Sequence, residues 1–197
     1  MNCPNETTNE TDINTQSQRP KISILTIAKI AAAVIAFLLI SAILGPGLIR
    51  LREYRHRIRC AENLTYLGKA MLIYAGEGDD KYPIADKWCD LLIEHAEVTP
   101  KSFRCKGAPE GPCNYAMNIN VEKMSIASQP DMVLLFETTP GWNQVGGSEI
   151  LTTENHQGEG CNILFVDGHI QFVKTKGLQN LKWESEKSEK AKTEPNQ

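Results

Sequence analysis

The sequence lacks the short motifs by which many enzymes and metal proteins are recognised. It contains no HExxH or CxxC spacing, no glycine-rich phosphate loop, and no paired-carboxylate or nucleophile–base motif. Aromatic residues are scarce, at 7% of 197 residues, and no aromatic stacking platform accompanies the arginines. We therefore expect no enzyme activity, catalytic residue, metal, cofactor or small-molecule substrate, and no nucleic-acid partner.

Charge is absent from one long block, residues 30–49, which reads IAAAVIAFLLISAILGPGLI. This is about the length of helix that crosses the roughly 30 Å hydrocarbon layer of a bilayer. A cleaved signal peptide is the alternative, but the block is long for one and no A-x-A-like cleavage site precedes a polar mature start. We predict a single-pass transmembrane helix over residues 22–49, which anchors the chain in the inner (cell) membrane.

Large apolar residues are almost absent from both ends of the chain. Residues 1–21 are rich in Asn, Thr and Gln, and residues 182–197 carry mixed charges in a low-complexity pattern. Neither end can bury enough surface to fold, so both are predicted to be disordered tails. The predicted folded domain is therefore confined to residues 50–181.

Apolar residues follow the anchor at steps of three and four, which predicts an amphipathic helix. Together with the anchor it should form one nearly continuous helix over about residues 23–75, which Pro46 kinks or breaks. Gly76 and Gly78 are the first stop signals. The predicted buried face comprises Leu51, Tyr54, Ile58, Ala61, Leu64, Gly68, Met71, Leu72 and Ala75.

Five arginines lie within ten residues just after the anchor: Arg50, Arg52, Arg55, Arg57 and Arg59. We interpret them as a juxtamembrane collar that is solvated or contacts anionic lipid headgroups of the bilayer. The positive-inside rule alone would place this side in the cytoplasm. A cytoplasm-facing adaptor that binds lipid or nucleic acid is therefore one alternative function.

The rest of the domain predicts short elements. A helix is expected over residues 86–95, a loop over 104–120, a buried strand from Met132, and a loop over 139–149. In CNILFVDGHIQFV, Asp167 and Gly168 predict a two-residue type I′ hairpin in which Val166 faces His169. The hairpin face that should pack on the helix then comprises Ile163, Phe165, Ile170 and Phe172. The predicted fold class is α+β.

The stretch from His156 to Val173 holds two histidines, an aspartate, a glutamate and a cysteine. The alternative function is a metal-dependent enzyme that uses His156, Asp167 and His169. A metal site needs three or more converging ligands, and these residues show no familiar spacing. We interpret Asp167 as a turn residue and His169 as a cross-strand residue, and thus the stretch as a structural hairpin.

Five cysteines follow the anchor, which favours an oxidising compartment. Cys105 with Cys113, or Cys89 with Cys105, are candidate disulfides, and the sequence does not choose between them. Buried reduced cysteines are the alternative. Because a large translocated domain can override its flanking charges, we place the domain outside the cytoplasm, in the periplasm of a bacterium.

Three stretches carry a family resemblance: RIRCAENLTYLGKAMLIYAGEGDDKYP, SFRCKGAP with NYAMN after it, and HQGEGCNILFVDGHIQFV. The chain resembles bacterial type IV pilin-like and type II secretion pseudopilin-like proteins. The closer resemblance is to the prepilin-like families of planctomycetes, whose C-terminal signature is His, nine residues, then Asp-Gly. Its counterpart here comprises His156, Asp167, Gly168 and His169. The resemblance implies a long N-terminal helix packed on a small antiparallel sheet that ends in a hairpin.

The chain departs from the family pattern at three points. Ten residues separate His156 from Asp167, Lys106 replaces the usual Pro, and RPKISILTIAKI lacks the Gly and Glu of a prepilin processing site. The resemblance implies a structural or assembly role in a pilus-like or type II secretion-like system, without processing by prepilin peptidase. The implied partners are the bilayer and other pilin-like subunits or a secretion platform.

Overall fold

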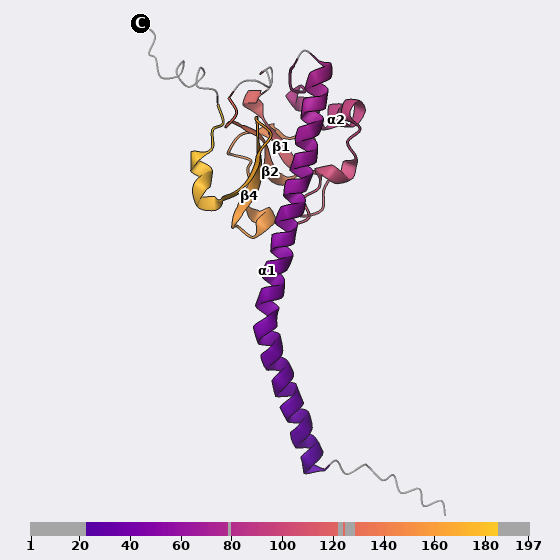
Figure 1. The fold of residues 1–197 in the computed structure, drawn as a ribbon, viewed down its shortest axis with the longest axis vertical. Coiled ribbons are helices and arrows are strands. Elements are labelled where there is room, and N and C mark those ends of the chain that lie inside the picture. The colour runs from indigo at the N-terminus through magenta and orange to yellow at the C-terminus, as the bar shows by residue number, and fades with distance from the viewer. Residues whose placement is uncertain (1–22, 79, 122–123, 125–128, 185–197) are drawn as a thin grey trace, which may run out of the picture. The chain divides into compact units, whose positions relative to one another are not determined.

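The structure is a computed structural model that describes residues 23–78, 80–121, 124 and 129–184 (Figure 1). The chain divides into two units, residues 1–46 and 47–197. The described part of the first unit belongs to helix α1 (Ile24–Glu77), and its large apolar side chains are exposed. α1 is long and apolar enough to cross a membrane, a test that a signal sequence also passes.

The second unit is built on one five-stranded, mostly antiparallel sheet. Its order is β3-β1-β2-β4-β5, and β3 pairs with β1 in parallel. A short helix, α2, follows α1 and begins directly after a 3₁₀ turn. The elements are β1 (Cys113–Asn118), β2 (Val133–Gly141), β3 (Val145–Gly146), β4 (Gly160–Phe165), β5 (Ile170–Lys174) and α2 (Trp88–Ala96). The α+β fold class is confirmed.

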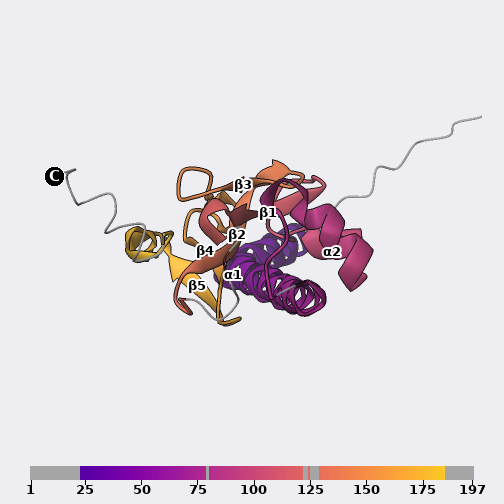
Figure 2. The ribbon, with the colours of Figure 1, turned by 90° about the horizontal axis from the view of Figure 1, so that it is seen from above.

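The part of α1 after Pro46 covers one face of the sheet, and α2 lies beside it (Figure 2). The contact is close at Gly68, where an added Cβ would lie 3.0 Å from a methyl carbon of Leu164. Leu64 and Met71 flank this point and are fully buried. Trp88 of α2 packs edge-on against Phe103 and completes the core on this side.

The opposite face of the sheet has a second apolar cluster, which the C-terminal segment covers. Phe136 packs edge-on against Trp183, with ring centroids 4.9 Å apart. The backbone N–H of Val133 donates to the carbonyl of Lys182. Lys182 and Trp183, which the sequence places in the tail over 182–197, therefore pack against the domain. The remaining predicted tails, 1–21 and 185–197, lie outside the described residues.

The predicted hairpin register is wrong by one residue. Leu164 pairs with Ile170, and the N–H of Phe165 donates to the carbonyl of His169. A type I′ turn needs positive φ at both central residues, but only Gly168 has it, at 87°. The loop is therefore three residues long, with Gly168 in the left-handed position of a bulge.

A one-residue shift exchanges the two faces of a strand. Leu164 and Val166 belong to the α1-facing core, whereas Ile163 and Phe165 belong to the second cluster. The predicted helix-facing set is therefore wrong for both β4 residues. Ile170 does pack against the α1-facing core.

The predicted buried face of α1 is correct only in its later part. Leu51, Tyr54 and Ile58 are exposed, whereas Glu53 and Cys60 are buried. In the later part, Leu72 alone of the predicted residues is exposed. The prediction failed because it assumed that a core-facing side chain is apolar. Here the first two turns that meet the domain face a polar cluster instead. The residues of α1 that are buried comprise Glu53, Cys60, Leu64, Leu67, Gly68, Ala70, Met71 and Ala75.

Several element predictions are confirmed. α1 is continuous through Pro46, α2 falls where the short helix was expected, and β2 begins one residue after Met132. The predicted loops are only partly correct. The loop over 104–120 contains β1, and the loop over 139–149 contains the end of β2 and all of β3. Gly, Pro and Asn flank β1 closely and obscured its short strand pattern.

Candidate functional site

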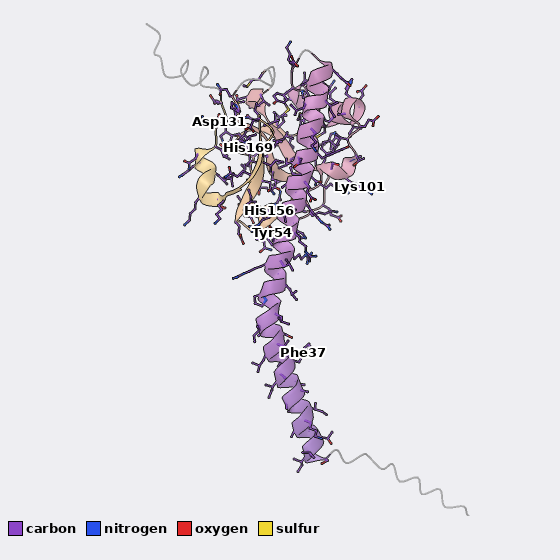
Figure 3. The ribbon with its side chains drawn as sticks, viewed as in Figure 1. Phe37, Tyr54, Lys101, Asp131, His156 and His169 are labelled. Atoms are coloured by element: carbon purple, nitrogen blue, oxygen red, sulfur yellow. A yellow bond between two sulfur atoms is a disulfide. The ribbon has the colours of Figure 1, made fainter. Side chains whose placement is uncertain are left out.

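A polar cluster is buried where α1 meets the sheet, and it is the main concentration of reactive groups among the described residues. It draws on α1, β2, β4, the segment after the turn at Pro100–Phe103, and the 3₁₀ turn Glu154–His156. Figure 3 shows His156 beside α1, close to the level of Tyr54. The cluster comprises Glu53, Cys60, Cys105, Glu137, His156 and Asn162, all of them buried.

His156 lies at the centre of this cluster and is fully buried. Its Nδ1 lies 2.8 Å from Oε1 of Glu53, and its Nε2 lies 3.0 Å from Oε1 of Glu137. Both ring nitrogens of the imidazole therefore face a carboxylate. The 105–111 segment packs closely against the turn that carries His156, and this requires a glycine, because a Cβ on Gly107 would lie 2.1 Å from the carbonyl oxygen of Asn155.

Glu137 is a fully buried carboxylate that follows the apolar run VLLF of strand β2. The backbone N–H of Asn162 donates to Oε2 over 3.0 Å, and its side-chain amide donates to Oε1 over 3.0 Å. A buried carboxylate is costly unless its oxygens are hydrogen-bonded, and here both are. Asn162 on β4 therefore holds the Glu137 side chain in one orientation.

The cluster favours the protonated, positively charged form of the His156 ring. Burial acts to lower the pKa of His156, but hydrogen bonds and charge from Glu137 and Glu53 outweigh it and raise the pKa above its ordinary value. Arg57 adds positive charge nearby, with its Nε 3.7 Å from Glu53. The guanidinium also pairs with Glu159 and lies 4.4 Å above the ring of Phe172.

A disulfide joins Cys60 of α1 to Cys105 and lies against the same groups. Sγ of Cys105 is 3.7 Å from Oε1 of Glu137 and 3.8 Å from Nε2 of His156. The bond closes a loop between residues 45 positions apart. In the chain-entropy account, a loop of this length stabilises the fold by about 4 kcal/mol. The disulfide thus fastens α1 to the domain beside the polar cluster.

Four of these residues present metal-binding atoms to one point. One ligand atom each from Cys60, Cys105, Glu137 and His156 lies within 4.8 Å of the others. Sulfur, imidazole nitrogen and carboxylate oxygen are the donors that bind Zn²⁺ in proteins. In the oxidised form described here, both sulfurs are occupied by their mutual bond.

The structure does not bring together His156, Asp167 and His169, the three residues of the alternative metal-site hypothesis. His156 precedes β4 and Asp167 follows it, and a six-residue strand spans on the order of 15–20 Å. Asp167 instead accepts from the backbone N–H of His169 over 3.0 Å, and the His169 ring stacks on Phe165. Gly168 completes that turn. Figure 3 likewise places His156 and His169 apart.

The cysteines pair differently from both sequence candidates. Cys105 bonds to Cys60, which the sequence reasoning did not consider as a partner, while Cys89, Cys113 and Cys161 are buried thiols. Burial, together with a hydrogen bond to Cys113, raises the pKa of the Cys89 thiol. Cys89 therefore lies beside Cys113, and its own thiol stays neutral.

The five arginines of the predicted collar differ in their exposure and contacts. Arg50, Arg52 and Arg55 are exposed, but Arg57 is half-buried against the domain. Arg59 lines a surface cleft of about 440 Å³. The cationic residues that line this cleft comprise Arg59, Lys101, Arg104 and Lys106.

Sequence reasoning missed most of the cluster. Glu53 is an acid within an arginine-rich helix, and Glu137 interrupts the apolar run MVLLFET. An isolated acid in a buried strand is a usable signal, since such a residue needs partners. Cys60 and Asn162 gave no such signal, because their roles depend on tertiary contacts.

Comparisons with protein-family models, with curated proteins and with solved structures find no match to this chain. The architecture alone, a long N-terminal apolar helix packed on a small mixed sheet, is consistent with a pilin-like fold. The fold and the cluster therefore carry the functional argument.

Proposed function

We propose that the chain is a single-pass membrane protein with a structural or assembly role, pseudopilin-like in its organisation. The observation that carries the proposal is the division of α1. The part before Pro46 exposes its apolar side chains, whereas the later part is built into the domain. A helix that serves both as anchor and as core element attaches the domain to the bilayer without a flexible linker.

The disulfide supports a location of the domain outside the cytoplasm. Disulfides persist in oxidising compartments such as the bacterial periplasm. Cys60 and Cys105 are both buried, and their bond lies in the core, where it acts as a structural link. This argument outweighs the arginines after the anchor, because the charge rule applies poorly to large translocated domains.

A structural role also fits the closure of the polar cluster. His156 and Glu137 have no exposed surface, so a substrate has no path to either side chain in the described conformation. The two groups hold α1 against the sheet rather than face a cleft. We propose that the chain is not an enzyme, and that it meets other pilin-like subunits or a secretion platform through its anchor. The missing processing motif leads us to propose that the anchor is not processed.

The test is site-specific photocross-linking of the full-length chain in native bacterial membranes. A photoreactive residue at Phe37, which is 70% exposed on the apolar part of α1, should yield adducts with itself or with other single-pass proteins. The matched control is the same probe at Ile84, an exposed position on the domain. Monomer alone at Phe37 and at further positions around that part of the helix would contradict the assembly role.

A further inference from the structure

The four-ligand cluster is nearly a metal site in its present geometry. For an ion at tetrahedral zinc distances, a sulfur lies about 3.5 Å from a nitrogen or oxygen ligand, and nitrogen and oxygen lie about 3.3 Å apart. The Cys105 sulfur lies 3.8 Å from His156 Nε2 and 3.7 Å from Glu137 Oε1, which are themselves 3.0 Å apart. Three separations therefore already fit within about half an ångström.

We propose that reduction of the Cys60–Cys105 disulfide converts this cluster into a binding site for one divalent zinc-class ion. The ligands are the two thiolates, Nε2 of His156 and the carboxylate of Glu137. The change needed is at Cys60, whose sulfur must part from that of Cys105 to about 3.8 Å and now lies within 4.8 Å of the other two ligand atoms. This site goes beyond the proposed assembly role and does not depend on it.

The groups behind the ligands favour the same conclusion. A metal-bound histidine commonly donates its second ring N–H to a carboxylate, which orients the ring and increases its basicity. Glu53 occupies that position, 2.8 Å from Nδ1 of His156. Asn162 orients Glu137 through two hydrogen bonds. The side chains of His156 and Glu137 are thus already fixed in orientation, so metal binding requires little rearrangement of either.

The chemistry balances with a thiol or phosphine reductant. A dithiol transfers two electrons and two protons to the disulfide and becomes a disulfide itself, leaving two thiols on Cys60 and Cys105. A phosphine supplies the two electrons and takes the oxygen of one water molecule to become a phosphine oxide, and that water provides the two thiol protons. Binding of the ion then releases the two thiol protons, and one more from Nε2 of His156 if that nitrogen carries one. Sulfur and imidazole ligands select Zn²⁺ over Mg²⁺ or Ca²⁺, which prefer oxygen.

The ion would take over the mechanical role of the disulfide. The bond links α1 to the segment that carries Cys105, and the ion would link the same two residues and also β2 and the His156 turn. With four protein ligands the site has no open position, which is typical of structural rather than catalytic zinc. The helix would remain fastened to the domain under both oxidising and reducing conditions.

The experiment uses the full-length chain in detergent micelles. The protein is reduced with a phosphine, desalted without oxygen, titrated with Zn²⁺ or Co²⁺, and analysed for bound metal and for its visible spectrum. We expect one ion per reduced chain, thiolate-to-cobalt charge transfer with tetrahedral Co²⁺ bands, and no stoichiometric ion on the oxidised chain. Circular dichroism and thermal unfolding report the fold in each state.

Two variants at ligand positions and one control variant assign the ligands. Cys105→Ser and Glu137→Gln should weaken Zn²⁺ binding at least tenfold, whereas Cys113→Ala, which alters a buried thiol outside the cluster, should leave it unchanged. If Cys105→Ser does not fold, Glu53→Gln keeps the test open, because loss of such a supporting partner weakens metal binding 10- to 100-fold.

Two results would overturn the proposal. One is a reduced, folded chain that takes up no stoichiometric Zn²⁺ or Co²⁺. The other is uptake that survives Cys105→Ser and Glu53→Gln but is lost in Cys113→Ala, since this would place the ion at Cys89 and Cys113 instead. If the reduced chain unfolds, addition of Zn²⁺ should restore its fold, and failure to do so counts against the site.

Discussion

Nδ1 of His156 and Oε1 of Glu53 lie 2.8 Å apart although 103 positions separate the two residues in the chain. The contact joins α1 to the turn that leads into β4, close to the disulfide. Both partners are buried, Glu53 at 7% and His156 at 0% exposure. The attachment of the helix to the sheet therefore depends on charge as well as on apolar packing.

Glu53→Gln should lower the free energy of unfolding of the oxidised chain by about 1–3 kcal/mol, the cost of removing one partner of a buried, charged hydrogen bond. Chemical denaturation followed by circular dichroism measures this difference. Glu62→Gln is the matched control, because Glu62 lies on the same helix but is exposed. Equal stability of the two variants would contradict a stabilising role for the contact.

Gly68→Ala should destabilise the domain by about 1–3 kcal/mol, because the added methyl group overpacks the contact with Leu164. Gly76→Ala, on the same helix with no atom within 4 Å of the new Cβ, should stabilise it by up to about 1 kcal/mol. Changes of opposite sign in the unfolding temperatures of the two variants would support this packing contact, and changes of the same sign would refute it.

The double variant Cys60→Ala/Cys105→Ala should lose about 4 kcal/mol of stability in metal-free buffer, as expected for a loop of 45 positions. Cys161→Ala removes a buried thiol that forms no disulfide and serves as control. Reduction of the wild-type chain without metal should give a loss of similar size. A loss under about 1 kcal/mol would show that the bond hardly constrains the unfolded chain.

Topology can be read from a new cysteine at an exposed position of the domain. Cys89, Cys113 and Cys161 are buried and should react slowly, so Ile119→Cys, at a position 54% exposed, is the better reporter. A membrane-impermeant maleimide should label it in cells with a permeabilised outer membrane, and an introduced cytoplasmic cysteine should stay unlabelled. Labelling of Ile119→Cys only after lysis would place the domain in the cytoplasm and favour the adaptor function.

Asp90 should titrate below an ordinary aspartate, because hydrogen bonds from Asn143 and then Trp142 favour its charged form and lower its pKa. A lowered folded pKa stabilises the fold above the unfolded pKa, and this contribution disappears as the pH falls through the folded pKa. Carboxyl NMR of the folded domain measures the pKa directly. Asn143→Ala should move it back toward the ordinary value, and an unchanged pKa would contradict the assigned cause.

Elements marked by repeated apolar residues could be predicted from the sequence. Features that depend on single contacts, such as a strand register, could not. The long apolar helix, α2 and β2 follow from runs of apolar residues, and these three elements are confirmed. The hairpin register depended on whether Asp167 takes positive φ, and a short motif does not determine this. The buried face of α1 was misplaced near Glu53, because periodicity reads hydrophobicity and this part of the interface is polar.

The candidate site was harder to predict than the fold for a related reason. Its ligands come from four separate parts of the chain, so no spacing motif marks them. His156 was singled out, but with Asp167 and His169, which are near it only in sequence. Glu137 was the available clue, as an acid in an apolar strand, and its partners could be identified only once the strands were paired.

The position of the disulfide also decides what a protease could release. α1 ends at Glu77, and the exposed turn that follows lies between Cys60 and Cys105 in the chain. A cut in this turn would break the backbone yet leave the domain covalently joined to α1 through sulfur. Shedding of the oxidised domain from a membrane would require a cut before Cys60, or the same cut followed by a reductant.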